Sequence, residues 1–184
     1  AADANEFVYA REVAAHFRAE HHEFKVSANQ FRDAIPTIVS HLDEPMADPT
    51  CIPLYFISRL ARQHITVVLS GEGADEIFGG YLYFHKAPDA REFHAETVRK
   101  LDALHQFDCA RANKAMMAWG VEARVPFLDL DFLDVAMAMD AEAKCVRERG
   151  GRRIEKAVLR EGFETLVKLI GPMDLIPDNK LQDM

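Results

Sequence analysis

The stretch HITVVLSGEGADEIFGGYLYFHKAP, residues 64–88, decides how the fold of this chain is interpreted. It begins with an apolar run at residues 65–69, which has the length of a strand and the composition of one that is covered on both faces. The run ends at Ser70, and residues 71–76 then supply two glycines and three carboxylates. Because ligands of open α/β sheets bind beyond the carboxyl ends of strands, this turn stands where a binding site is expected.

The residue types of the turn suit a nucleotide and a metal ion. Glycines allow backbone N–H groups to approach an anion without a Cβ atom in the way. Asp75 offers the oxygen ligand that Mg²⁺ prefers, usually together with substrate phosphates. Glu72 is suited to act as a base or to position an amine. The alternative is a tight turn before an acidic helix start, since Asp and Glu favour helix N-termini without any ligand, and spacing alone leaves both interpretations open.

Composition places the chain among ordinary globular proteins. Its 184 residues are enough for one domain with a real core, and 49% of them are hydrophobic and 28% charged. The formal net charge of −8 argues against nonspecific binding to nucleic acid or to an anionic membrane surface. No apolar run approaches the roughly 20 residues of a membrane helix. The three cysteines form no CxxC pair and no disulfide pattern, so a cytoplasmic location is expected.

Periodicity predicts an α/β fold whose C-terminal half is mostly helical. Ser27 and Gln30 match a capping box, and Asp129 is placed to cap a later helix. Helices are predicted at residues 5–19, 28–42, 53–62, 90–118, 130–139 and 152–166, strands at 21–26 and 65–69, loops at 43–49 and 121–129, and an exposed linker at 144–153. Two strands are too few for a stable parallel sheet, so further strands are expected in the chain or outside it.

Four ordered segments carry a resemblance to a known family. LSGEGADEIFGGYLYFHKAP, residues 69–88, resembles the asparagine synthetase signature, Ser-Gly-Glu-Gly-(Ser/Ala)-Asp-Glu followed by Phe-Gly-Gly-Tyr. Three more segments are similar to that family in the same order: LDEPMADPTCIPLYFISRLAR at 42–62, DCARANKAMMAWGVEARVPFLD at 108–129 and IEKAVLREGFE at 154–164. The likeness covers about residues 5–164, and four motifs in order argue against a chance match.

The resemblance implies a partial parallel sheet of the ATP-pyrophosphatase type and an ATP-dependent ligase. ATP with Mg²⁺ would adenylate the side-chain carboxylate of aspartate, and ammonia made from glutamine in a separate domain would then displace AMP. Matched by position, Ser70 and Gly71 would contact the nucleotide. Glu72 would face the acyl-adenylate and the incoming ammonia. Asp75 would hold Mg²⁺, and Lys156 would stabilise phosphoryl or pyrophosphate charge. Related β-lactam synthetases have Tyr in place of this Glu, which favours the asparagine type.

The chain also departs from the family. The pyrophosphate loop, Ser-Gly-Gly-x-Asp-Ser, does not occur in these 184 residues, whose only Ser-Gly is Ser70-Gly71. The glutaminase domain with its N-terminal Cys is absent too, and the missing strands would precede the first residue. Residues 1–164 are therefore assigned to an incomplete synthetase domain and residues 165–184 to an unmatched tail. We expect this chain alone to lack synthetase activity.

Two alternatives to the asparagine ligase stay open. One is a non-catalytic remnant that acts by pairing with another subunit, and the other is a related ligase that amidates a different acid. An incomplete sheet exposes edges and apolar surface, so self-association or pairing with a missing domain is expected. The eight histidines show no metal-ligand spacing, and surface or packing positions are the favoured interpretation.

Overall fold

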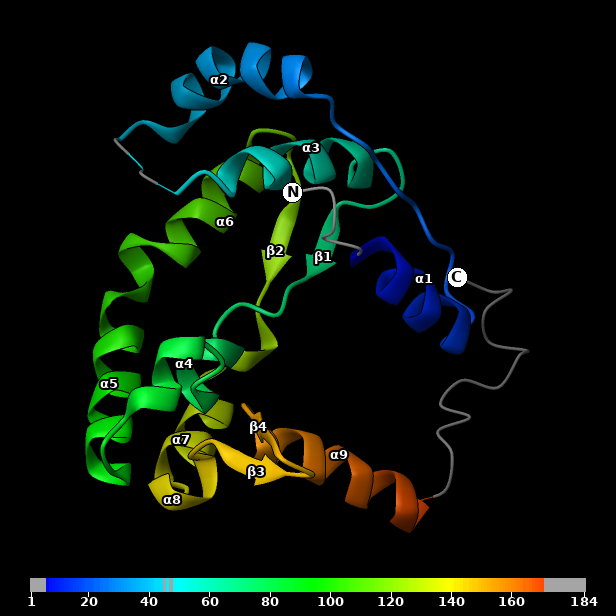
Figure 1. Ribbon diagram of the computed structural model, residues 1–184. Helices are drawn as coiled ribbons and strands as arrows, with labels where there is room; N and C mark the ends of the chain where they lie inside the picture. Colours follow the sequence, from blue (N-terminus) through cyan, green and yellow to red (C-terminus); the bar gives the residue numbers. More distant parts are fainter. Residues whose placement is uncertain (1–5, 45, 47, 171–184) are drawn as a thin grey trace. The chain divides into compact units, whose positions relative to one another are not determined.

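A computed structural model describes residues 6–44, 46 and 48–170 of the chain, with backbone alone for Glu6, Arg149 and residues 167–170 (Figure 1). The described α-helices are α1 (Glu6–His16), α2 (Ala28–Leu42), α3 (Cys51–Ala61), α4 (Ala74–Phe78), α5 (Ala90–Ala103), α6 (Asp108–Met117), α7 (Leu130–Ala138), α8 (Ala141–Lys144) and α9 (Ala157–Ile170). The strands are β1 (Val67–Leu69), β2 (Glu122–Arg124), β3 (Arg147–Arg149) and β4 (Arg152–Ile154), and 3₁₀ helices cover Leu82–Lys86, Leu104–Gln106 and Pro126–Leu128.

The chain divides into two compact units, which are described separately. The first contains the described part of residues 1–68 together with 111–123, and the second contains 69–110 together with the described part of 124–184. The predicted α/β class with a mostly helical C-terminal half is confirmed, because the chain combines small sheets with many helices. Over the part of the chain that is described, no helix is both long and apolar enough to cross a bilayer.

Helices α2 and α3 enclose the apolar core of the first unit. The Ser27 hydroxyl accepts a hydrogen bond from the Gln30 N–H at 3.2 Å, and the Gln30 side chain accepts one from the Ser27 N–H at 2.9 Å, which confirms the predicted capping box. The buried core residues are Ile38, Leu42, Cys51, Ile52, Tyr55 and Phe56. The strand predicted at residues 21–26 is wrong, because this segment forms no ladder with any described strand.

The strand predicted at residues 65–69 is present as β1, which is shorter than predicted. Its partner β2 lies in the segment 121–129, for which a loop is predicted. In the first unit the Glu122 N–H donates to the Thr66 carbonyl at 2.8 Å. In the second unit the Ser70 N–H donates to the Arg124 carbonyl at 2.8 Å. Residue numbers rise in the same direction along both strands between these two bonds, so β1 and β2 are parallel, as Figure 1 also shows.

Strand β1 is not covered on both faces, which corrects the expectation from its apolar sequence. Ile65 is 42% exposed, Val67 36% and Leu69 72%. Within the described residues β2 is the single strand that pairs with β1, so no third strand is present beside it. The apolar sequence of β1 therefore fits the interior of a larger sheet than the described residues form.

The C-terminal half differs from the predictions in two places. The helix predicted at 90–118 is interrupted between α5 and α6, where Phe107 leaves helical geometry with ψ −95° and Asp108 begins the next helix, as an acidic residue favours. The predicted linker and the start of the last predicted helix form the β3–β4 hairpin instead. Gly150 and Gly151 connect the strands with φ angles of +60° and +73°. Positive φ at both central residues is what a type I′ hairpin turn requires.

Candidate functional site

The glycine-rich turn leads from β1 directly into α4. Gly73 has a φ of +95°, and a Cβ atom at this position would lie 2.3 Å from Cδ2 of Leu128, so both the backbone and the packing require glycine. Helix α4 then begins at Ala74, with Asp75 and Glu76 in its first turn. The first glycine of the turn, Gly71, is exposed, and nothing lies within 4 Å of the Cβ that an alanine would place there. The backbone at Gly71 is therefore open to approach.

Asp75 and Lys156 meet although they are far apart in the sequence. The Lys156 ammonium donates to Oδ1 of Asp75 at 2.7 Å, and the two side chains remain 24% and 39% exposed. Lys156 has a φ of +54°, in the left-handed region that costs about 1–3 kcal/mol for a non-glycine residue. Its carbonyl accepts the Arg160 N–H at 3.1 Å, so this strained residue stands at the start of α9. A strained cation beside an exposed carboxylate is typical of a functional position.

Gly80 makes room for the Asp75 carboxylate. A Cβ atom on Gly80 would lie 1.7 Å from Oδ1 and 2.7 Å from Cγ of Asp75. The Gly80 N–H also donates to the Asp75 carbonyl at 2.9 Å, which fixes the turn against the first residues of α4. Sequence reasoning did not assign a role to this glycine. The doubled glycine of Phe-Gly-Gly-Tyr was its only signal, and the reason for it is visible only in three dimensions.

A buried carboxylate, that of Glu76, holds the segment after Gly80 through a hydrogen bond. Glu76 is 3% exposed and accepts a hydrogen bond from the Tyr81 hydroxyl. Burial and the neighbouring Glu76 raise the pKa of Tyr81 well above its usual value, so the phenol keeps the proton that it donates. Lys100 lies 5.4 Å from the ring centroids of Tyr81 and Tyr83. These contacts hold the segment after Gly80 in place and were not predicted from the sequence.

The other residues expected at the site lie in the turn itself. Ser70 and Glu72 are half-buried, and Ser70 is anchored through its backbone N–H to Arg124. The structure thus brings Asp75 and Lys156 into direct contact and places Ser70, Gly71 and Glu72 in the turn that leads into Asp75. The roles of the five residues toward a nucleotide, an acyl group and a metal ion stay predictions.

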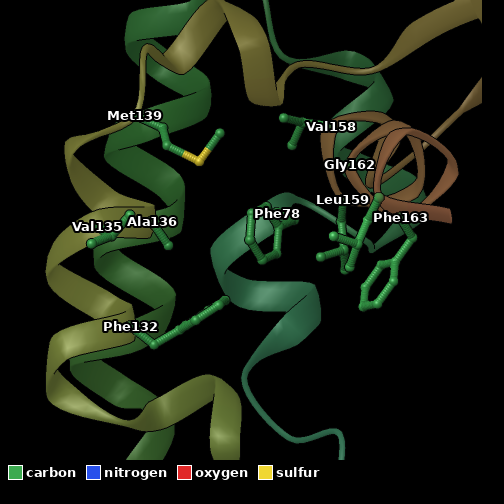
Figure 2. A pocket seen from close by; sticks show the side chains of 10 residues that line it. Phe78, Phe132, Val135, Ala136, Met139, Val158, Leu159, Gly162 and Phe163 are labelled. Carbon is green, nitrogen blue, oxygen red and sulfur yellow. The ribbon is translucent and has the colours of Figure 1, made fainter. Parts of the chain in front are cut away.

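An apolar pocket in the second unit is a separate feature (Figure 2). It has a volume of about 260 Å³ and lies among α4, α7 and α9. Its lining is apolar throughout and includes Phe78, Phe132, Met139, Val158, Leu159 and Phe163. The pocket therefore offers no group for acid–base or phosphate chemistry, and the polar turn at Asp75 is the stronger candidate for a reaction site.

Comparison with known proteins places the chain in a family. The family model described as asparagine synthase matches residues 1–93 and 86–169. The chain is 52% identical over 169 residues to a probable glutamine-hydrolysing asparagine synthetase of Dictyostelium discoideum, covering 89% of this chain and 30% of the relative. It is 54% identical over 160 residues to asparagine synthetase B of Escherichia coli, covering 84% of this chain and 28% of the relative.

A third relative is asparagine synthetase 2 of Arabidopsis thaliana, which is 53% identical over 159 residues, or 84% of this chain and 27% of the relative. The chain thus spans somewhat less than a third of the length of these relatives. The chain belongs to the asparagine synthase family.

Proposed function

We propose that this chain supplies one half of the ATP site of a glutamine-hydrolysing asparagine synthetase. In the proposed reaction an oxygen of the aspartate side-chain carboxylate attacks the α-phosphorus of ATP, and pyrophosphate leaves. Ammonia derived from glutamine then attacks the acyl carbon, and AMP leaves as asparagine forms. The observation that carries the proposal is the contact between Asp75 and Lys156 directly behind an open glycine turn. Sequence identity of about half to proteins of this name supports it.

The residues at Asp75 fit a magnesium ion together with phosphate groups. Mg²⁺ in phosphate-transfer sites is commonly held by one or two carboxylates plus substrate phosphates, and it neutralises phosphate charge when bound. Asp75 offers one such carboxylate at 39% side-chain exposure. Lys156 balances that carboxylate at 2.7 Å and is placed to turn its ammonium toward a phosphoryl oxygen. These roles are proposed from donor chemistry and position.

The remaining roles follow from the turn. Gly71 binds the nucleotide through its backbone, because no side chain blocks approach there. Ser70 binds it through the side-chain hydroxyl, since its N–H is bonded to the Arg124 carbonyl. Glu72 faces the acyl group and accepts a proton as ammonia becomes an amide nitrogen. The partners are small molecules, namely ATP, aspartate and ammonia, and the cell compartment is proposed to be the cytoplasm. The second half of the site, including the pyrophosphate loop, has to come from outside these 184 residues.

A chimera tests whether this segment is a working part of a ligase. Residues 6–164 replace the matched segment of about 160 residues in E. coli asparagine synthetase B. We expect aspartate-dependent release of AMP and pyrophosphate within about tenfold of the parent enzyme, a difference of roughly 1.4 kcal/mol in the barrier. Glutamine hydrolysis by the parent's other domain is the control for folding. Intact glutamine hydrolysis without pyrophosphate release would favour the non-catalytic remnant, and release with another acid would favour the related ligase.

The isolated chain is expected to give no aspartate-dependent exchange between ATP and labelled pyrophosphate. The physical reason is that the pyrophosphate loop supplies the second half of the phosphate contacts, and that motif does not occur in this sequence. The parent E. coli enzyme under the same conditions is the positive control. Measurable exchange by the purified 184-residue chain would contradict the proposed division of the site.

Substituting Gly80 with alanine is expected to lower the pyrophosphate release of the chimera by about 100-fold, because displacement of a reacting group by about 1 Å has that effect. The added methyl group would overlap the Asp75 carboxylate, which must leave its contact with Lys156. The matched control is Gly162→Ala in α9, where no atom lies within 4 Å of the new Cβ. Equal rates for Gly80→Ala and the parent chimera would contradict a role for this glycine in placing Asp75.

A further inference from the structure

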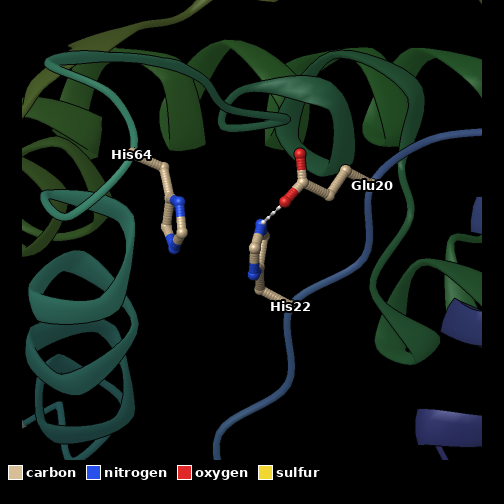
Figure 3. Close-up of side chains that lie close together, drawn as sticks. All are labelled: Glu20, His22 and His64. Atoms are coloured by element: carbon tan, nitrogen blue, oxygen red, sulfur yellow. Dashed lines mark ion pairs between the residues drawn. The ribbon is translucent and has the colours of Figure 1, made fainter.

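Three side chains on the first unit form a cluster that the proposed function does not use. They are Glu20, His22 and His64, and their ligating atoms all lie within 4.8 Å of one another (Figure 3). Nε2 of His22 is 3.1 Å from Oε1 of Glu20, and the His22 and His64 rings stack with centroids 4.0 Å apart. We propose that this cluster binds a divalent transition-metal ion, with Zn²⁺ as the best-suited ion.

The chain presents the first two ligands from one side of a non-helical segment. Residues two apart in an extended chain point the same way, which brings Glu20 and His22 together. His21 and Glu23 are also two residues apart, and they form a second pair, with Nε2 of His21 3.1 Å from Oε1 of Glu23. Arg11 holds both oxygens of Glu23 at 2.5 and 2.6 Å, so that carboxylate is neutralised by a cation. The Glu23 carboxylate is therefore already paired with a cation, whereas the Glu20 carboxylate contacts the His22 ring.

The third ligand arrives from the turn that follows α3. The N–H groups of His64 and Ile65 both donate to the Ala61 carbonyl, at 2.9 and 2.8 Å. These bonds fix the backbone of the turn, and the His64 ring reaches the face of the His22 ring. His22 and His64 are far apart in the sequence, so no ligand spacing reveals them, and the sequence favours surface or packing roles for both.

The donor set and its geometry both suit zinc. Two imidazoles and one carboxylate make up a recognised zinc set that leaves a fourth position open for water. Ligands bound at about 2.0–2.1 Å in a tetrahedron lie about 3.3 Å from each other, and the 3.1 Å between His22 and Glu20 is close to that value. No two ligating atoms are more than 4.8 Å apart, so the widest separation has to shrink by at most about 1.5 Å on binding. All three residues are exposed, so their side chains are able to rotate into place.

The test is titration of the full 184-residue chain with zinc chloride by calorimetry, after treatment with a chelator. We expect one ion per chain with a Kd below about 100 μM. His22→Ala and His64→Ala are each expected to weaken binding by at least about tenfold, the loss usual for a disturbed metal site. His21→Ala is the matched control, a histidine one residue away in the other couple, and it should leave the Kd within about twofold.

Cobalt is a second probe, because thiolate ligands add a charge-transfer absorption that histidine and carboxylate ligands do not. A visible cobalt band without that absorption, and lost in the His64 variant, would support the cluster. Circular dichroism of each variant confirms the fold, and Glu20→Gln replaces any variant that fails this check. Absence of saturable zinc binding, equal loss in the His21 variant, or a thiolate spectrum would overturn the proposal.

Discussion

Replacing Lys156 with methionine in the chimera is expected to lower kcat for aspartate-dependent pyrophosphate release roughly 100- to 1,000-fold, or about 2.7–4 kcal/mol in the barrier. Methionine preserves the length of the side chain but removes the ammonium, so charge that develops on the phosphates loses a fixed donor. The kcat of Lys156→Arg is expected to lie between those of the unsubstituted chimera and Lys156→Met, because a planar guanidinium does not place a point charge at the same position. Steady-state kinetics at saturating ATP measures the effect.

The chain contains a matched control for this substitution. Lys114 donates to Asp43 at 2.7 Å, the same distance as in the Lys156–Asp75 pair. The Asp43 side chain is 67% exposed and the pair lies outside the glycine-rich turn, so Lys114→Met should leave kcat nearly unchanged. If both variants lose activity equally, or if neither does, Lys156 has no special part in the reaction. The glutaminase rate of each chimera shows whether the protein is folded.

Replacing Phe93 with alanine is expected to lower the free energy of unfolding of the chain by about 3–5 kcal/mol, the usual loss for a buried phenylalanine. Phe93 is 1% exposed, and its ring centroid is 5.0 Å from that of Phe84. Its ring also fills the space beside Gly79, where a Cβ atom would lie 2.3 Å from Cζ of Phe93. Its removal leaves a cavity next to the turn that positions Asp75.

Urea unfolding followed by circular dichroism measures this effect. Phe107→Ala is the control, because Phe107 is the same residue type but 61% exposed, and a change within about 0.5 kcal/mol is expected there. Similar losses for the two variants would show that Phe93 is not a core residue of the second unit. The chimera with Phe93→Ala should also lose pyrophosphate release, since the turn at Gly79 and Gly80 is no longer supported.

The sequence by itself determined the features that depend on neighbouring residues. The capping box at Ser27 and the helix start at Asp129 follow from hydrogen bonds that span three residues or fewer, and both were predicted and are present. Local composition predicts a strand at 65–69, of which Val67–Leu69 forms, and the glycine turn after it. Two local signals were overlooked: the alternation Val-Glu-Ala-Arg-Val at 121–125, which forms β2, and Gly150-Gly151, which turns the β3–β4 hairpin.

Only the tertiary structure decided which residues meet. Lys156 reaches Asp75 across 81 positions, and nothing in the spacing of the two residues predicts a contact of 2.7 Å. The need for glycine at position 80 arises from the place of the Asp75 carboxylate, and the cluster at His22 and His64 arises from a turn that follows α3. The physical reason is the same in each case. Local hydrogen bonds and side-chain patterns fix helices and turns, whereas contacts between distant residues depend on how those elements pack.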